Sequence, residues 1–192
     1  KKTNFNIESI IQLNPFYFEG DLLIKNKKVE KIIDSFLVNL FLYDKNLLGN
    51  INGLLKIKFD KLNNKLIKSG EIDLLINEKE INIKKGIFIL DKIGKIYSNI
   101  SFFEKNGIIK FISKNQLNIE NHIEFAKVFQ VGSKKIKNLK NIYFELEKNI
   151  GDTDFIITNV KIDNLENNRK LEEIFLVKNI QNLRSHIRKI ID

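Results

Sequence analysis

The feature that most constrains this chain is a succession of segments in which apolar and polar residues alternate with a period of two. The first clear example is residues 55–60, where apolar and charged side chains take turns without interruption. Because successive side chains of a β-strand point to opposite faces, this pattern predicts strands with one buried and one solvated face. Similar segments follow at residues 71–76, 81–90, 95–103, 108–113, 142–147 and 154–162, and residues 4–25 predict two short strands broken near Pro15.

The breaks between these segments are short and polar. Asn63-Asn64, Asn77-Glu78, Asp91–Gly94 and Asn106-Gly107 all carry turn-forming residues, and Asn-Gly is a strong hairpin signal. Short connections join neighbouring antiparallel strands, so we predict an antiparallel meander that forms an extended curved sheet. Lys84-Lys85-Gly86 interrupts the alternation and predicts a β-bulge.

Three segments change to helical spacing, with apolar residues recurring every three or four positions. They predict amphipathic helices at about residues 28–42, 121–131 and 169–191. Asn121 stands three residues before Glu124, the arrangement of a capping box at a helix start. The predicted class is therefore mainly β (α+β), with a meander sheet and three helices.

We expect one domain over residues 1–192 that belongs to a larger protein, because the chain starts at Lys1 and contains no Met. Within it, residues 1–45 are predicted to form lead-in strands and a helix. Residues 46–164 are predicted to form the antiparallel sheet with a short helix, and residues 165–192 the C-terminal helix. A hydrophobic content of 43% is ample for a buried core.

The composition bounds the function in two ways. The chain has no Cys, which excludes disulfides, thiolate metal sites and a cysteine nucleophile. The net charge is +9, which suggests nucleic acid or an anionic surface as a partner. Nearly all of these cations are Lys set opposite apolar strand positions, however, and nucleic-acid readers favour Arg. A solvated outer face is the favoured interpretation of the charge.

No motif predicts catalysis. His122 and His186 fall on separate predicted helices without a second His at ligand spacing, so neither predicts a metal site. The segment 132–135 has the letters of a phosphate loop but lacks the preceding glycine and strand. Asp152 and Asp154 lie in a predicted turn. The sequence therefore predicts a protein that is not an enzyme and needs no cofactor or metal.

The candidate functional feature is the apolar side of the alternating pattern. If the strands align, this side forms one face of a continuous sheet. The face is either a core covered by the helices or, in part, an open apolar trough. The second alternative arises because three helices can be too few to cover all of the strands. Both alternatives stay open. The residues of this face are Leu55, Ile57, Phe59, Ile72, Leu74, Ile76, Ile100, Phe102, Ile109, Phe111, Ile142, Phe144 and Leu146.

Four strings in this region carry a family resemblance: Gly53–Ile57 opening the meander, the Lys92–Ile96 turn, the Gly107–Ser113 strand and the Glu124–Lys127 helix. With them, residues 52–164 resemble the C-terminal region of AsmA-like proteins, the group that includes the TamB and YhdP relatives of Gram-negative bacteria. The resemblance implies a curved sheet whose apolar concave face carries phospholipid across the periplasm. The predicted helix at the C-terminus has no counterpart in it.

The prediction that follows is a non-catalytic cell-envelope module with a role in outer-membrane biogenesis. Its partners are phospholipid acyl chains and the remainder of the same polypeptide, with no nucleic acid. It is expected in the periplasm, tethered to the inner membrane by a segment outside this chain, since the longest apolar runs fall far short of about 20 residues. The alternatives are a structural β module without ligand and a basic binder of nucleic acid or anionic surfaces.

Overall fold

The computed structural model describes the chain in thirteen stretches. These are residues 5–14, 16–25, 52–62, 66–77, 80–105, 108–132, 134, 136–149, 152, 154–162, 170–171, 175–177 and 180–191. The chain falls into two compact units, which are treated separately below. Unit 1 comprises Lys1–Asp91 and Ser98–Phe103, and unit 2 comprises Lys92–Tyr97 and Glu104–Asp192.

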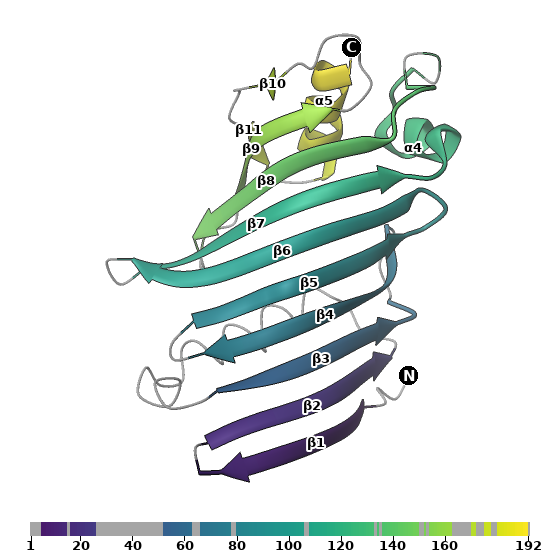
Figure 1. Cartoon of the computed structure of the whole chain (residues 1–192). Helices are drawn as coiled ribbons and strands as arrows, with labels where there is room; N and C mark the ends of the chain where they lie inside the picture. Colours follow the sequence, from purple (N-terminus) through teal and green to yellow (C-terminus); the bar gives the residue numbers. More distant parts are fainter. Residues whose placement is uncertain are drawn as a thin grey trace. The chain divides into compact units, whose positions relative to one another are not determined.

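Strands dominate both units, which confirms the predicted mainly β class (Figure 1). Unit 1 holds β1 (Phe5–Leu13), β2 (Phe16–Lys25), β3 (Asn52–Asp60), β4 (Ile67–Asn77), β5 (Glu80–Leu90) and part of β6 (Gly94–Lys105). Unit 2 holds the rest of β6, β7 (Ile108–Ile119), α4 (His122–Phe129), β8 (Asn141–Asn149), β9 (Phe155–Ile162), β10 (Lys170–Leu171), β11 (Phe175–Val177) and α5 (Ile180–Ile191).

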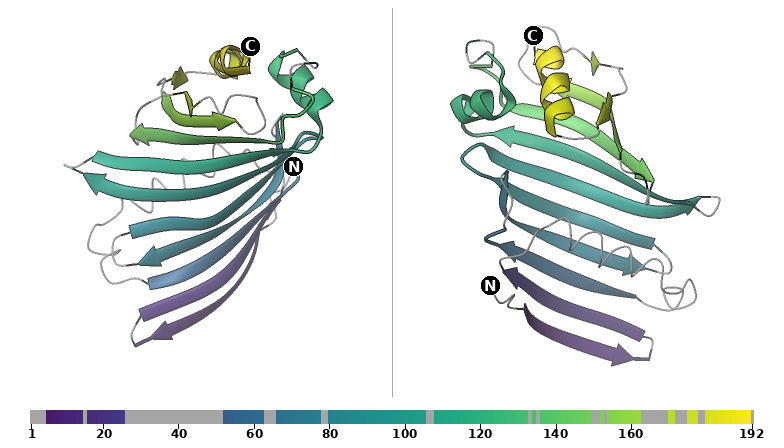
Figure 2. Two further views of the ribbon diagram at one scale, coloured as in Figure 1. Left: turned by 45° about the horizontal axis from the view of Figure 1, so that its top comes forward. Right: turned by 180° about the vertical axis from the view of Figure 1, so that it is seen from behind.

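Unit 1 is a sheet in which β1 to β5 lie side by side in sequence order, twisted and curved along their length (Figure 2). Three of the four pairings are antiparallel, as the meander prediction requires. The pairing of β2 with β3 is parallel, with Leu22 opposite Ile57, which corrects the prediction at this point. Parallel neighbours need a crossover of a dozen or more residues, and residues 26–51 supply that length.

The predicted bulge is present in β5. Asp73 of β4 pairs with Lys85 and the next residue, Leu74, pairs with Ile83, so that Lys84 is the extra residue of the ladder. The predicted helix at residues 28–42 lies outside the described residues. So do the Asn63-Asn64 and Asn106-Gly107 turns, whereas the Asp91–Gly94 turn is confirmed.

Unit 2 is built around the antiparallel strands β7, β8 and β9. The far edge of β9 is paired by β10 and β11. This corrects the helix predicted over residues 169–191, because α5 begins only at Ile180. The spacing of Leu171, Ile174 and Phe175 in the sequence fits a helix. In the structure, however, β11 pairs with β9, with Phe175 opposite Ile157. Tertiary pairing here overrides a short local pattern.

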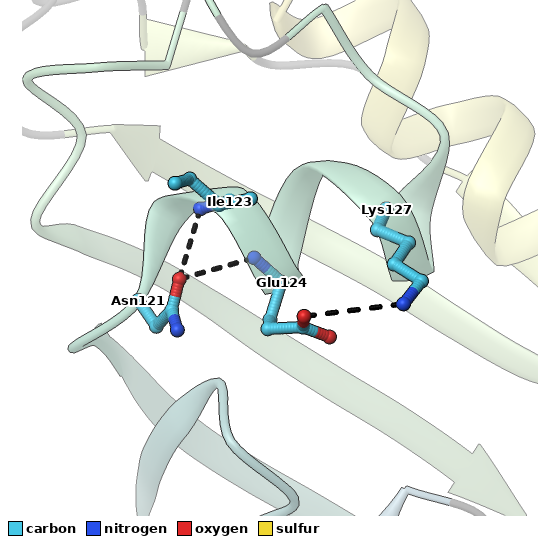
Figure 3. A network of polar contacts seen from close by, with 4 residues as sticks. All are labelled: Asn121, Ile123, Glu124 and Lys127. Carbon is cyan, nitrogen blue, oxygen red and sulfur yellow. Dashed lines mark hydrogen bonds and ion pairs between the residues drawn. The ribbon is translucent and has the colours of Figure 1, made fainter.

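Helix α4 shows how its own sequence sets its boundaries. The side-chain oxygen of Asn121 accepts hydrogen bonds from the backbone N–H groups of Ile123 and Glu124, both at 3.1 Å (Figure 3). The capping box is only half formed, because the N–H of Asn121 donates to the carbonyl of Ile93. Glu124 instead forms an ion pair with Lys127. The helix ends at Phe129, slightly before the predicted end.

Gly94 is the glycine whose conformation the fold of unit 2 depends on. It follows the turn after Asp91 and has a φ of 153°, a region that L side chains rarely adopt. A Cβ at this position would collide with the carbonyl oxygen of Asn118. Close approach of the turn to β7 therefore requires glycine here.

Candidate functional site

The strand registers of unit 1 place six of the predicted residues on one side of its sheet. Residues directly opposite each other in a ladder share a face. Leu55 pairs with Leu74 and Ile57 with Ile72, while Ile76 lies opposite Gly53 and Phe59 opposite Gly70. We call this side the apolar face of unit 1. It continues onto β5 through Ile81 and Ile83, which pair with Ile76 and Leu74.

Two further predicted residues reach the same face from β6. A methyl group placed on Gly86 would lie 3.3 Å from the Cβ of Ser98, so Ser98 shares the face of Gly86. Gly86 is itself opposite Ile72. By strand alternation, Ile100 and Phe102 follow Ser98 on the apolar face.

Unit 2 aligns the remaining predicted residues in its own sheet. Leu117 of β7 pairs with Ile142, Asn115 with Phe144 and Ser113 with Leu146. Phe111 lies on this side as well, opposite Lys148. Ile109 belongs to β7, but its side chain lies outside the described residues. The predicted alignment therefore holds within unit 2 for Phe111, Ile142, Phe144 and Leu146.

Burial divides the predicted residues into two classes. The first class is nearly or fully shielded from solvent and comprises Ile57, Phe59, Ile72, Leu74, Ile76, Phe102 and Ile142. The second class is half-buried and comprises Leu55, Ile100, Phe111, Phe144 and Leu146. In each unit the residues of the first class are closed packing, and only those of the second class have surface available to a ligand.

The apolar face becomes open toward β1 and β2, a feature that sequence reasoning missed. Ile7 and Ile11 share this face because they pair with Leu22 and Phe18, and they are 63% and 58% exposed. Leu13, opposite Phe16, is 80% exposed, whereas Leu74 of β4 is 0% exposed. Ile7, Ile11 and Leu13 have the even spacing of one strand face, which was a usable signal, but this spacing does not predict exposure.

A buried polar pair interrupts the corresponding face of unit 2. Ser113 and Asn115 are both buried on β7, where the pattern Ile109, Phe111 predicts apolar neighbours. The Ser113 hydroxyl donates to Oδ1 of Asn115 at 2.8 Å. The Asn115 amide donates to the carbonyls of Ser113 and Phe144 at 3.1 and 3.5 Å. The pair is satisfied by local hydrogen bonds, so it adds polarity without an isolated polar group.

The opposite side of unit 1 carries charged as well as apolar side chains, and some of its charged groups form cross-strand ion pairs. Lys85 Nζ lies 2.8 Å from Glu71 Oε1, and Lys56 Nζ lies 3.6 Å from Glu19 Oε1. The hydrogen bond from Lys85 lowers the pKa of the Glu71 carboxyl, and the same bond raises the pKa of the Lys85 ammonium. Acidic partners offset part of the basic charge here, which agrees with a solvated outer face.

The residues weighed for catalysis belong to different elements. His122 begins α4 and His186 lies within α5, and Asp152 caps a turn by accepting from the Asn149 amide at 3.0 Å. Within the described stretches, no three His, Cys, Asp or Glu side chains are grouped to hold a metal ion. In the same stretches, no helix has the length and apolar content that a membrane span requires.

Comparison with known proteins adds no relative to this description. No family model, no curated protein and no solved structure matches the chain significantly. The AsmA-like resemblance of residues 52–164 stays a prediction.

Proposed function

We propose that this chain is a non-catalytic lipid-binding module of the cell envelope. Its apolar sheet face would contribute to a groove for phospholipid transport between the inner and outer membranes, in the periplasm. Tethering to the inner membrane would come from a segment outside residues 1–192, and the remainder of the same polypeptide would complete the groove. The AsmA-like resemblance supplies this setting.

One observation carries the proposal. The apolar face of unit 1 keeps its character from β4 to β1, apart from Ser9, while its exposure rises from 0% at Leu74 to 80% at Leu13. A contiguous exposed apolar surface marks a site for lipid, membrane or protein. Each methylene group of an acyl chain gains about 0.8 kcal/mol when it leaves water for such a surface.

The proposal assigns different roles to the two burial classes. Closed residues such as Ile57 and Leu74 stabilise the sheet. Acyl chains would contact the open part of the face, where Phe18 and Leu22 of β2 are half-buried and Ile7 and Ile11 of β1 are exposed. Half-buried Leu55 of β3, which pairs with Gly20 of β2, would border this part.

Leu22 and Leu23 of β2 provide a matched test. Both are half-buried leucines, but Leu22 pairs with Ile7 on the apolar face and Leu23 pairs with Asn6 on the other side. We expect Leu22→Glu to abolish binding of a fluorescent phospholipid and its transfer between vesicles. Leu23→Glu is expected to retain both. Circular dichroism of each variant checks that the fold persists.

The binding partner itself is tested on the unmodified chain. Lipids extracted from the purified protein and identified by mass spectrometry are expected to include phospholipid. If no lipid co-purifies and no fluorescent phospholipid binds, the proposal fails and a structural module without ligand takes its place. Equal transfer by Leu22→Glu and Leu23→Glu would show that the apolar face is not the lipid surface.

A further inference from the structure

The end of unit 2 at which α4 begins is rich in lysine. Within residues 92–95 and 118–140, the described residues include six Lys but only two Glu. The two carboxylates form ion pairs with two of these lysines, at 3.1 and 3.9 Å. In the described part of the chain, no ion pair includes the other four, which are Lys92, Lys134, Lys137 and Lys140. This end of unit 2 therefore carries positive charge that acidic side chains leave unmatched.

Backbone hydrogen bonds hold these segments together at the start of α4. The N–H groups of residues 120–121 both donate to the carbonyl of Ile93, at 2.9 and 3.0 Å. The N–H of Ile119 donates to the carbonyl of Lys140 at 2.8 Å. The turn that carries Lys92 and the end of the loop after α4 therefore meet at neighbouring residues of the chain.

The loop after α4 has an apolar inner side and a basic outer side. Its described residues are 130–132, 134 and 136–140. The side chains of Val131, Ile136 and Leu139 are buried, and the N–H of Leu139 donates to the carbonyl of Ile136 at 3.0 Å. The lysines of the loop are all exposed, namely Lys134, Lys137 and Lys140. Because the apolar residues anchor the loop, its lysines are held together on the solvent side.

An aliphatic side chain is exposed at the same end of unit 2. Ile123, in the first turn of α4 (Figure 3), is 62% exposed, whereas Phe125 and Phe129 of this helix are buried. Proteins bind nucleic acid mainly through Arg and through aromatic side chains that stack on bases. An anionic bilayer instead attracts Lys to its headgroups and takes up aliphatic side chains beneath them. Lysines combined with an exposed isoleucine fit a lipid surface better than nucleic acid.

We propose that this end of unit 2 docks on the surface of a membrane that contains anionic phospholipid. We call it the basic surface, and its residues are Lys92, Ile123, Lys134, Lys137 and Lys140. The lysines approach the lipid phosphates, and Ile123 enters the interface. The proposal stands apart from acyl-chain binding by unit 1, because it rests on charge and on a different part of the chain.

Vesicles of two compositions test the partner on the unmodified chain. The protein is sedimented with vesicles of phosphatidylcholine alone or mixed with phosphatidylglycerol. Each lysine near an anionic bilayer increases binding roughly fivefold, so we expect at least about tenfold tighter binding to the anionic vesicles. Added salt should weaken this binding, because it screens exposed charges. Equal binding to both compositions would overturn the proposal.

Neutralising the loop tests the basic surface itself. Lys134→Gln/Lys137→Gln/Lys140→Gln removes three exposed charges that form no ion pair with described residues. At roughly fivefold per lysine, we expect it to bind anionic vesicles about a hundredfold more weakly than the wild type. Circular dichroism checks that the fold persists.

A second triple variant separates position from net charge. Lys110→Gln/Lys114→Gln/Lys161→Gln removes the same number of charges from β7 and β9 of unit 2. These lysines lie outside the basic surface, so we expect this variant to lose less than about fivefold in vesicle binding. Similar losses in the two triple variants would show that net charge alone drives binding, and would overturn the proposal.

Ile123 distinguishes a lipid surface from nucleic acid. Ile123→Ser should weaken binding to anionic vesicles by about threefold or more, because the variant has less apolar surface to bury. Its salt dependence should match that of the wild type. A wild-type chain that binds single-stranded DNA more tightly than anionic vesicles, with an Ile123→Ser variant that binds both equally well, would assign the basic surface to nucleic acid instead.

The outcomes separate this proposal from acyl-chain binding by unit 1. Leu22→Glu is expected to lose the fluorescent phospholipid but to dock on anionic vesicles as the wild type does. The triple variant of the loop is expected to bind dispersed fluorescent phospholipid normally and to lose vesicle docking. Vesicle docking that Leu22→Glu abolishes and the loop variant retains would place the membrane contact on unit 1 and overturn the basic surface.

Discussion

Units 1 and 2 both contain strands with one apolar face, but the kinds of residue that are buried in their interiors differ. In unit 1 the buried residues of β3 to β5 are almost all aliphatic or aromatic side chains that alternate along the strands. Unit 2 adds the buried side of α4, with Phe125 and Phe129 at a ring distance of 4.6 Å, and the polar pair Ser113 and Asn115. Alternation alone therefore describes the interior of unit 1 much better than that of unit 2.

The largest effect is expected in unit 1, where two leucines of the same face differ most in burial. Leu74→Ala removes a side chain that is 0% exposed, and we expect a loss of about 2 to 5 kcal/mol in the free energy of unfolding. Leu13→Ala makes the same chemical change at 80% exposure and should stay within about 0.5 kcal/mol. Urea unfolding of both variants measures the difference. Equal losses of unfolding free energy in the two variants would contradict the difference in burial between Leu74 and Leu13.

The second effect concerns the polar part of unit 2. Asn115→Ala removes the hydrogen bonds to Ser113 and Phe144, and we expect a loss of about 1 to 3 kcal/mol in unfolding free energy. Gln116→Ala is the control, since Gln116 is only half-buried on the opposite side and bonds Asn141 at 3.2 Å. Combining Ser113→Ala with Asn115→Ala should recover part of the loss, because it removes the unmatched hydroxyl. A variant pair without this recovery would mean that Ser113 and Asn115 act independently.

These two regions also show how far the sequence predicts the fold and the site. The period of two correctly predicted that Ile57, Ile72 and Leu74 share a face, because strand geometry dictates it. It did not predict that Leu13 is open and Leu74 closed, since exposure depends on what packs against a face. Nor did it predict that Asn115 is buried, because its hydrogen-bond partners are Ser113 of the same strand and Phe144 of β8.

Two errors in the predicted fold, one of element type and one of strand pairing, have a common physical origin. Leu171 and Phe175 fit helical spacing in the sequence. In the structure they belong to β10 and β11 instead, because both strands pair with the edge of β9. The parallel pairing of β2 with β3 likewise depends on where distant segments meet. Local sequence patterns predict which face of an element is apolar, while the pairing partners of a strand are set by tertiary structure. Short turns such as Asp91–Gly94 were predictable because they join neighbours in sequence.

A third effect tests the helix that distinguishes unit 2. Asn121→Ala removes the side-chain oxygen that accepts from Ile123 and Glu124, and we expect a loss of about 0.5 to 2 kcal/mol. Asn121→Ser should retain most of the stability, because serine also caps helices well. Thermal unfolding followed by circular dichroism gives both values. If alanine and serine behave alike, packing of Phe125 and Phe129 fixes the helix without its cap.

The smallest effect belongs to the charged side of unit 1. The hydrogen bond from Lys85 holds the pKa of Glu71 below its ordinary value of 4.5. The ionised carboxylate therefore contributes stability that is present above that pH and is lost as the pH falls through the lowered pKa of the folded state. Glu71→Gln should lower the melting temperature by only about 1 °C at pH 7, because both side chains of the pair are more than a third exposed. This difference should vanish in acid below the lowered pKa, where the wild-type carboxyl is also neutral. A difference that persists unchanged at low pH would mean that Glu71 stabilises the strand by packing, and that the charged side of unit 1 contributes through contact as the apolar face does.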